Sequence, residues 1–414
     1  MKKTKIQIRK DDRCPICREF FVDKNNKVIR DMMQDKHAGV VHAGCFMPYF
    51  PEEKIKILFK VLCYSIGDTI ATTPILREMK RLYPAANFTV MTLFPDIFKH
   101  NPNASMILDL NKPIEQSMVD AHHFQLNAFD STDRHHFAMH SVEFSSQSAL
   151  NRSIPREAWQ YELNYSDEDR KRALDVALEI GINPVNDSVI LVHPHGTEWK
   201  TRDWGPAHMQ TLVDMLPSGY KIVSVGGKRG EVPAREMKNY VSLNNIFADV
   251  YGKMSILETC AFMDLPCMKL MVTPDTGALH IAASRPELPI VGIFTLIRAH
   301  LRAPVRNGLF GYKFLGVESV NPCNCTLDAR SMTTEMNLTI CPKRTFLERT
   351  LAAKRLTEEQ KAIGIKNTIG FDAKLEDFNP KTLPCYPMPE RVLQACLAIL
   401  RGHQDEHADL YTRS

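Results

Sequence analysis

Residues 270–284, LMVTPDTGALHIAAS, predict the end of a buried strand, a short polar turn and the first turns of a helix. Because the first backbone N–H groups of a helix lie at the positive end of its dipole, such a turn is a natural site for phosphate. Asp275 can accept hydrogen bonds from sugar hydroxyls, Gly277 lets an anion approach the backbone, and His280 follows one turn into the helix. On this stretch alone, an ordinary strand-to-helix turn with His280 in the core is the simpler interpretation. The segments upstream decide between the two.

Upstream, strands and helices alternate as they do in a parallel sheet. The apolar run at residues 54–64 predicts a buried strand, residues 70–82 carry helical periodicity, and two further strands follow. This βαβ order predicts an α/β fold with a doubly wound sheet. Gly67 and Asp68 fall in the turn after the first strand, at the carboxyl end where α/β proteins bind ligands. The structural alternative for Asp68 is to cap the next helix.

The second half of the chain repeats this pattern and adds cations at the strand ends. After a buried strand, the next loop carries Lys200 and Arg202. Such cations are usually solvated, but these lie at the carboxyl end of a strand and face the expected cleft. A further strand ends in Gly226, Gly227 and Lys228, where backbone N–H groups can contact a diphosphate, although a lone pair of glycines is a weak signal.

Length and composition indicate a globular protein of two large domains. The chain has 414 residues, of which 44% are hydrophobic and 24% charged. Its net charge of +4 permits an anionic partner without requiring one. No apolar run is long enough to span a bilayer, and the basic N-terminus lacks the apolar core of a signal peptide, so we expect a cytoplasmic protein.

The N-terminal residues predict a small zinc-binding unit. Two pairs of candidate ligands occur there, each pair separated by two residues, which is the spacing of a tetrahedral zinc site. Cytoplasmic cysteines are reduced, so metal is expected before disulfides. The metal would supply folding energy that so small a core cannot, and a full set of protein ligands makes it structural. The four ligands are Cys14, Cys17, His42 and Cys45, with His37 as an alternative to His42.

Two later regions are less specific. A second set of cysteines, with one CxC pair and long gaps, fits a metal site and plain thiols equally well. Five histidines between His122 and His140 show no ligand spacing, and we expect them on the surface or in an acceptor groove. The second cysteine set is Cys323, Cys325, Cys341 and Cys385.

A helix is predicted at residues 167–180, and residues 181–184, GINP, which end it, are the candidate hinge between the two halves. The expected units are a zinc-binding unit at 1–50, a first doubly wound domain at 51–182, a second at 183–385 with an insertion at 345–378, and a C-terminal helix and tail at 386–414.

In order and spacing, the motifs resemble glycosyltransferase family nine, the ADP-heptose:lipopolysaccharide heptosyltransferases. The matching segments are IGDTIATTPILREMKRLYP, KTRDWGP, GG, YGKMSILE and VTPDTGALHIAA. The resemblance implies a GT-B fold, in which two Rossmann-like doubly wound domains face each other across a cleft. It makes residues 51–182 the acceptor domain and residues 183–385 the nucleotide-sugar domain. It also implies inverting transfer of a sugar from a nucleotide sugar to an acceptor hydroxyl, without a catalytic metal.

The resemblance also assigns roles to matched residues. It implies that Asp68 is the general base for the acceptor hydroxyl, and that Lys200 or Arg202 stabilises the leaving diphosphate. Asp275 corresponds to the ligand of the donor sugar. The expected donor-binding set is Gly67, Gly226, Gly227, Lys228, Asp275, Thr276, Gly277 and His280.

The resemblance does not extend to the regions that would meet an acceptor, because the N-terminal unit, the histidine-rich stretch and the insertion have no counterpart in the family. A lipopolysaccharide core glycan is the family's usual acceptor, and a lipid-linked one would make the protein membrane-peripheral. A basic arm beside a zinc unit also fits a polyanion, so a phage-type DNA glycosyltransferase acting on a hydroxymethylated base in the host cytoplasm is the alternative. A non-catalytic GT-B binding protein is a third, which the presence of Asp68, Lys200 and Asp275 together opposes.

Overall fold

The computed structural model describes most of the two expected large domains. The described residues are 54–122, 124–130, 139–150, 153–194, 204–227, 242–295, 297–319 and 386–402, together with the backbone of the strands β1 (Met32–Asp35) and β2 (Gly39–His42). β1 and β2 pair antiparallel. No helix in the described part of the chain is long and apolar enough to cross a membrane.

The N-terminal domain is built on a four-stranded parallel sheet in the order β5-β4-β3-β6. β3 is central because its apolar residues are buried on both faces, as in the parallel sheets of α/β proteins. The strands are β3 (Lys56–Leu62), β4 (Asn87–Thr92), β5 (Met106–Asp109) and β6 (Phe124–Asp130). The helices are α1 (Ile66–Ala71), α2 (Thr73–Leu82), α3 (Gln116–Asp120), α4 (Ser141–Leu150) and the 3₁₀ turns η2 (Pro95–Phe98) and η4 (Arg156–Ala158).

The C-terminal domain is built on a six-stranded parallel sheet in the order β14-β11-β10-β7-β8-β9. Its strands are β7 (Val189–Val192), β8 (Lys221–Ser224), β9 (Ala248–Asp249), β10 (Met268–Pro274), β11 (Ile290–Phe294) and β14 (Phe314–Glu318). Its helices are α5 (Asp167–Glu179), α6 (Pro206–Met215), α8 (Ile256–Met263), α9 (Gly277–Ala283), α13 (Pro389–Leu400) and η5 (Ala299–Leu301). β12 (Val305–Arg306) and β13 (Leu309–Phe310) form a hairpin beside them.

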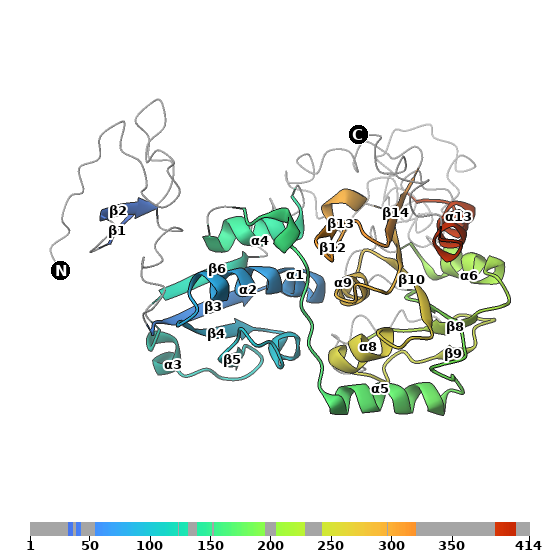
Figure 1. Cartoon of the computed structure of the whole chain (residues 1–414), viewed down its shortest axis with the longest axis horizontal. Helices are drawn as coiled ribbons and strands as arrows, with labels where there is room; N and C mark the ends of the chain where they lie inside the picture. Colours follow the sequence, from blue (N-terminus) through green and yellow to red (C-terminus); the bar gives the residue numbers. More distant parts are fainter. Residues whose placement is uncertain are drawn as a thin grey trace, which may run out of the picture.

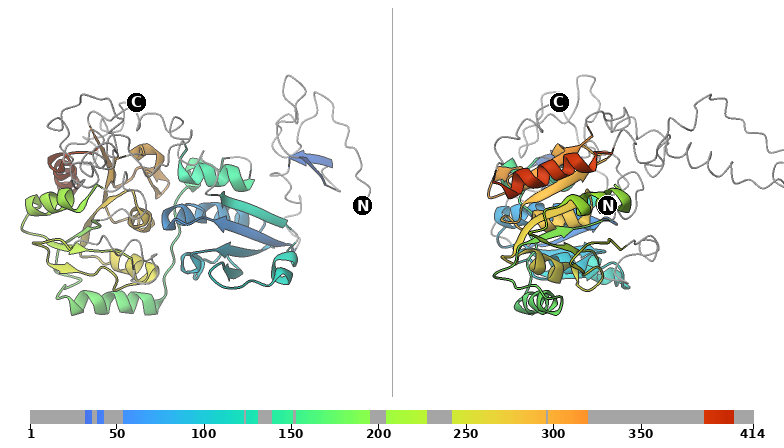
Figure 2. Two further views of the ribbon diagram at one scale, coloured as in Figure 1. Left: turned by 180° about the vertical axis from the view of Figure 1, so that it is seen from behind. Right: turned by 90° about the vertical axis from the view of Figure 1, so that its right-hand side faces the viewer.

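Both sheets have the same strand order at their centre. In each sheet, the first three strands of the chain lie side by side: β3, β4 and β5 in one, and β7, β8 and β9 in the other. The fourth strand, β6 or β10, then pairs with the free side of the first strand. The two sheets lie side by side in the views of Figure 1 and Figure 2. Ligands of such sheets bind beyond the carboxyl ends of the strands at the point where the order reverses. The mixed α/β fold with two doubly wound parallel sheets is the one expected from the sequence.

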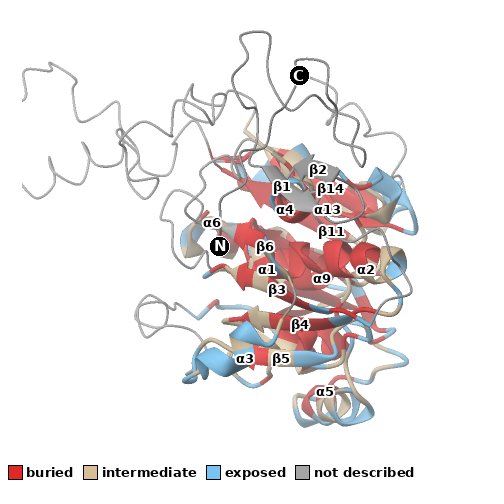
Figure 3. Cartoon of the chain, turned by 90° about the vertical axis from the view of Figure 1, so that its left-hand side faces the viewer, coloured by how far each residue is buried: buried red, intermediate tan, exposed pale blue. Residues whose placement is uncertain are grey.

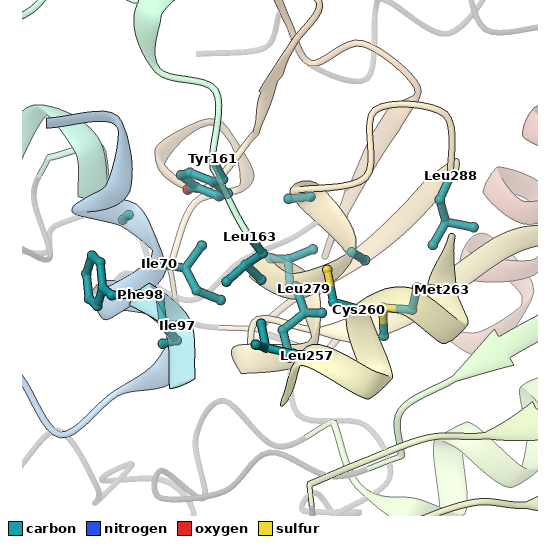
Figure 4. Packing of buried hydrophobic residues seen from close by; sticks show 14 of the residues in the cluster. Ile70, Ile97, Phe98, Tyr161, Leu163, Leu257, Cys260, Met263, Leu279 and Leu288 are labelled. Atoms are coloured by element: carbon teal, nitrogen blue, oxygen red, sulfur yellow. The ribbon is translucent and has the colours of Figure 1, made fainter. Parts of the chain in front are cut away.

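The strands of both sheets are largely buried, whereas α3 and the outer side of α5 are exposed (Figure 3). One face of the C-terminal sheet packs against α6 and α13 in a separate apolar cluster. The other face packs against α8 and α9, and this apolar cluster continues into the N-terminal domain. Figure 4 shows the continuation, in which Ile70 and Leu279 approach each other across Leu163 of the connecting segment. Apolar side chains therefore form part of the contact between the domains.

The connection between the domains lies earlier than the sequence suggested. α5 packs against α8, and Lys221 Nζ of the C-terminal sheet donates to Gly181 O at 2.9 Å. The candidate hinge at residues 181–184 is therefore inside the C-terminal domain, and the chain crosses over at residues 153–166 (Figure 1). Glycine and proline marked the end of the helix correctly, but they carry no information on which sheet the helix covers.

The helix expected at residues 70–82 begins earlier and is divided in two. Ser65 caps α1 by accepting from Asp68 N at 3.4 Å, so the cap is Ser65 and not Asp68. α2 begins after Thr72, with Pro74 in its first turn. Proline has no N–H to donate to the preceding turn, which accounts for the break between α1 and α2.

Candidate active site

The N-terminus of α1, after β3, meets α9, after β10. A Cβ on Gly67 would lie 2.5 Å from His280 Cδ2, and a Cβ on Gly277 would lie 3.1 Å from Ile66 Cβ. Two glycines therefore allow the helices of the two domains to approach each other closely. The sequence predicted that Gly277 admits an anion. In this structure its open side faces Ile66.

Asp68 lies in the first turn of α1 and is partly exposed. Negative charge is favourable at this end of a helix. The Cys63 thiol lies 3.9 Å from Asp68 Oδ2, and Cys63 Sγ also accepts from Ser65 N at 3.2 Å. The carboxylate is thus held near the carboxyl end of β3 and still reachable from outside, as a general base must be.

Asp275 and His280 are enclosed instead. They are 4% and 3% exposed, and His280 Nε2 lies 4.0 Å from Asp275 Oδ1. The turn is fixed because Asp275 N donates to Ile293 O of β11 at 3.2 Å. Thr276 is the N-cap residue of α9, but its hydroxyl contacts that of Thr273 at 3.2 Å and makes no cap hydrogen bond. The start of α9 therefore keeps backbone N–H groups that its own cap residue does not use.

The connecting segment contributes Tyr161 to the same place. Its ring lies 5.5 Å from that of His280, and it is 3% exposed. Burial raises the pKa of Tyr161 above its usual value, and the nearby charges of Asp68 and Asp275 raise it further. The structure thus brings together a helix turn from each domain and the segment between them. No motif in the sequence marks Tyr161.

Arg302, in the loop after β11, brings a positive charge to this neighbourhood. It is 3% exposed, donates to Leu301 O at 2.8 Å and to Met139 O of the N-terminal domain at 3.3 Å, and its charge acts to lower the pKa of Tyr161. No sequence signal singles out Arg302, because a single arginine in a loop is usually solvated.

Gly226, just after β8, lies against the ring of Tyr251. A Cβ there would lie 1.9 Å from Tyr251 Cε2, so the glycine makes room for an aromatic ring. That ring is parallel to His193, with centroids 6.2 Å apart, and His193 Nδ1 lies 2.8 Å from Val225 O. Gly227, beside it, is partly exposed. These residues follow β7, β8 and β9, at the carboxyl ends of adjacent strands.

His140 does not lie on the surface or in a groove, as the sequence suggested. It is buried and stacked on Trp159 at 4.5 Å, its Nε2 lies 3.0 Å from Ala303 O, and its Nδ1 accepts from Val142 N at 3.2 Å. Burial, opposed by the Ala303 hydrogen bond and aided by the charge of Arg302, lowers its pKa to about 3. His140 is a neutral residue that joins α4 to the C-terminal domain.

Several residues selected from the sequence lie outside the described residues, and only the backbone of His42 is described. Within the described part of the chain, no group of three or more His, Cys, Asp or Glu side chains is placed to hold a metal ion. The residues outside are Lys200, Arg202, Lys228, Cys14, Cys17, Cys45, Cys323, Cys325, Cys341 and Cys385.

Comparison with known proteins gives a family match. The model of glycosyltransferase family 9 (heptosyltransferase) matches residues 87–308, more than half of the chain. No curated protein sequence matches the chain.

Among solved structures, a family 9 glycosyl transferase from Veillonella parvula is 14% identical, with a TM-score of 0.53 over 86% of this chain and 99% of its own. The iron-containing dodecameric glycosyltransferase TibC from enterotoxigenic E. coli is 11% identical, with a TM-score of 0.52 over 88% of this chain and 82% of its own. TibC has also been solved in complex with ADP-D-β-D-heptose. At these identities the likeness to solved structures concerns the fold.

Proposed function

Since the chain belongs to glycosyltransferase family 9 and is a glycosyltransferase, we propose that it moves a sugar from a nucleotide sugar to an acceptor hydroxyl, with inversion and without a catalytic metal. The observation that carries this proposal is the meeting of Asp68 from one sheet with Asp275 and His280 from the other. Each lies just beyond a strand at which its sheet reverses order, and α1, which carries Asp68, packs against α9, which follows Asp275 and carries His280.

In the proposed reaction, Asp68 takes the proton of the acceptor hydroxyl as its oxygen attacks the anomeric carbon. The bond between that carbon and the diphosphate oxygen breaks, and its electron pair leaves with the diphosphate. Attack opposite the leaving group inverts the anomeric centre. The partial exposure of Asp68 supports this role, since an acceptor must reach it. The family match begins after Asp68, so its role rests on position and on the resemblance of its motif.

The donor would be bound by the C-terminal domain. Asp275 would accept hydrogen bonds from the sugar, and the start of α9 would favour the negative diphosphate. Lys200, or Arg202, would stabilise the charge that develops on the leaving group. ADP-heptose is the first donor to test, because the structurally similar TibC has been solved with it.

The experiment is a transfer assay with ADP-heptose or UDP-glucose as donor. The acceptors are a truncated lipopolysaccharide core and duplex DNA with and without hydroxymethylcytosine, each over a salt series. We expect nucleoside diphosphate release that requires the core glycan and changes little with salt. Transfer that requires the modified base and falls steeply with salt would show that the acceptor is DNA and not a glycan. Nucleotide binding without turnover of either donor would contradict the transfer reaction.

We also propose that residues 1–50 hold a structural zinc. TibC is described as iron-containing, and the thiolates of the second cysteine set suit zinc or iron equally. Metal analysis of the purified chain should find zinc that disappears in Cys14→Ser and persists in the matched variant Cys323→Ser. Chelation should leave the main unfolding transition in place. Loss of that transition would show that the zinc supports the large domains as well.

A further inference from the structure

Tyr161 differs from a core tyrosine in one respect. Its hydroxyl is buried and has no hydrogen-bond partner among the described residues. A buried hydroxyl without a partner costs free energy, and native proteins contain few of them. Tyr165, four residues further along the same segment, is the ordinary case, because its hydroxyl donates to Asp264 Oδ2 at 2.6 Å.

The backbone around Tyr161 is held in place from both domains. On one side, Glu162 N donates to Thr73 Oγ1 at 2.9 Å and Glu162 Oε1 accepts from Arg77 Nη1 at 2.8 Å. On the other side, Leu163 O accepts from Arg285 Nη2 at 2.6 Å. The ring is therefore positioned by main-chain and side-chain bonds that do not involve its hydroxyl. Such a fixed group is suited to bind a ligand without a rearrangement of its own.

The surroundings of the hydroxyl specify what it could bind. Figure 4 shows the ring extending from the connecting segment toward the N-terminal domain, on the side of Ile70. Its neighbours include His280, and the charges of Asp68 and Asp275 are close enough to act on it. A phenol beside two carboxylates stays protonated, so it offers a neutral hydrogen-bond donor. A sugar hydroxyl is a matching acceptor.

We propose that the Tyr161 hydroxyl donates a hydrogen bond to a hydroxyl of the transferred sugar and positions that sugar between Asp275 and Asp68. This inference rests on the proposed function, which places the donor sugar at Asp275 and the attacking hydroxyl at Asp68. It adds a specificity residue from the connecting segment to a site otherwise formed by the two sheets. Tyr161 contacts the sugar, whereas the nucleotide is bound by the C-terminal domain.

The test compares Tyr161→Phe with the matched variant Tyr165→Phe. ADP-heptose and ADP are titrated separately into the wild type and each variant, and the unfolding midpoint of each protein is measured without ligand. Tyr161→Phe should bind ADP-heptose about tenfold more weakly and ADP as the wild type does. Its midpoint should be unchanged or higher, because no existing hydrogen bond is lost. Tyr165→Phe should lower the midpoint and leave both affinities unchanged.

A Tyr161→Phe protein that binds ADP-heptose as tightly as the wild type overturns the inference. An equal loss of affinity for ADP and ADP-heptose also overturns it, as does a lowered midpoint with unchanged affinities, which shows a structural role. If Tyr161→Phe shows the sugar-specific loss but the wild type transfers no sugar to any acceptor, the sugar contact stands and the proposed reaction fails. A wild type that binds neither ADP-heptose nor ADP contradicts both proposals.

Discussion

Each sheet places a carboxylate beside the point where its strand order reverses, but the two carboxylates have different surroundings. Asp68 follows the first strand of the N-terminal sheet and is partly exposed on a capped helix turn. Asp275 follows β10 of the C-terminal sheet and is 4% exposed, with His280 beside it. The strand order therefore places both carboxylates at the contact between the domains. The packing around the two turns leaves Asp68 partly exposed and buries Asp275. We assign proton transfer to the first and sugar binding to the second on this difference.

The largest expected effect is that of Asp68→Asn. This change keeps the shape of the side chain and removes its basicity, so transfer should slow by about 10²–10⁴-fold. Affinity for ADP-heptose should stay near that of the wild type. Steady-state transfer and calorimetric titration measure the two quantities. An equal loss of transfer rate and of affinity for ADP-heptose would show that Asp68 binds the donor, as Asp275 is proposed to do.

Gly67→Ala tests whether the site depends on the close approach of the two helices. The added Cβ would lie 2.5 Å from His280 Cδ2, and buried His280 has little room to move. The helices should separate slightly, and kcat/KM should fall by about 10–100-fold, as expected for a misplacement of order 1 Å. Gly219→Ala is the control, since a Cβ there meets nothing within 4 Å. Equal activity of the two variants would contradict the account of the contact.

Asp275→Asn should act mainly on the donor. Hydrogen bonds to a charged group contribute about 1.5–3 kcal/mol, so affinity for ADP-heptose should fall by at least about tenfold. Affinity for ADP alone should change less, because the proposed contact is to the sugar. Titration of both ligands checks this, and an unchanged affinity for ADP-heptose would remove Asp275 from the site.

The smallest effect concerns His140, which joins α4 to the C-terminal domain through its contact with Ala303 O. Its pKa is lowered to about 3, so the folded state binds this proton less readily than the unfolded state. Stability is therefore complete above the unfolded pKa of about 6.5 and is lost as the pH falls toward 3. At pH 5.5 the loss is about 1.4 kcal/mol.

Urea unfolding at pH 7.5 and pH 5.5 measures this loss. His140→Gln, which cannot titrate, should lose less stability over the same interval. An identical pH dependence in the variant would show that the acid sensitivity comes from other groups.

Local signals in the sequence predicted most strands of the two sheets and the turns at Asp68 and Asp275, but not β6, β14 or the start of α1. The turns at Asp68 and Asp275 each follow an apolar run and precede a helix, and such strand–turn–helix patterns require no knowledge of distant residues. The parallel α/β class follows from the same alternation. The sequence was therefore sufficient to predict the class of fold and the position of each of these two turns within its own domain.

The remaining features depend on residues far apart in the sequence. Tyr161 and Arg302 reach the site because the connecting segment and the loop after β11 pack against both domains, and no spacing encodes this. Gly67 was expected to bind the donor and Gly226 to contact a diphosphate, and in the structure their missing side chains also make room for His280 and Tyr251. The sequence does not show which side chain packs against each glycine, because tertiary packing decides it.

The most direct test of the account is hydrogen–deuterium exchange of the wild type with ADP-heptose compared with ADP. We place the sugar at the contact between α1 and α9, and the nucleotide on the C-terminal domain alone. ADP should protect the turn before α9. ADP-heptose should add protection at residues 65–71 of α1 and at residues 153–166 of the connecting segment. Added protection confined to the C-terminal domain would contradict a sugar site between the domains.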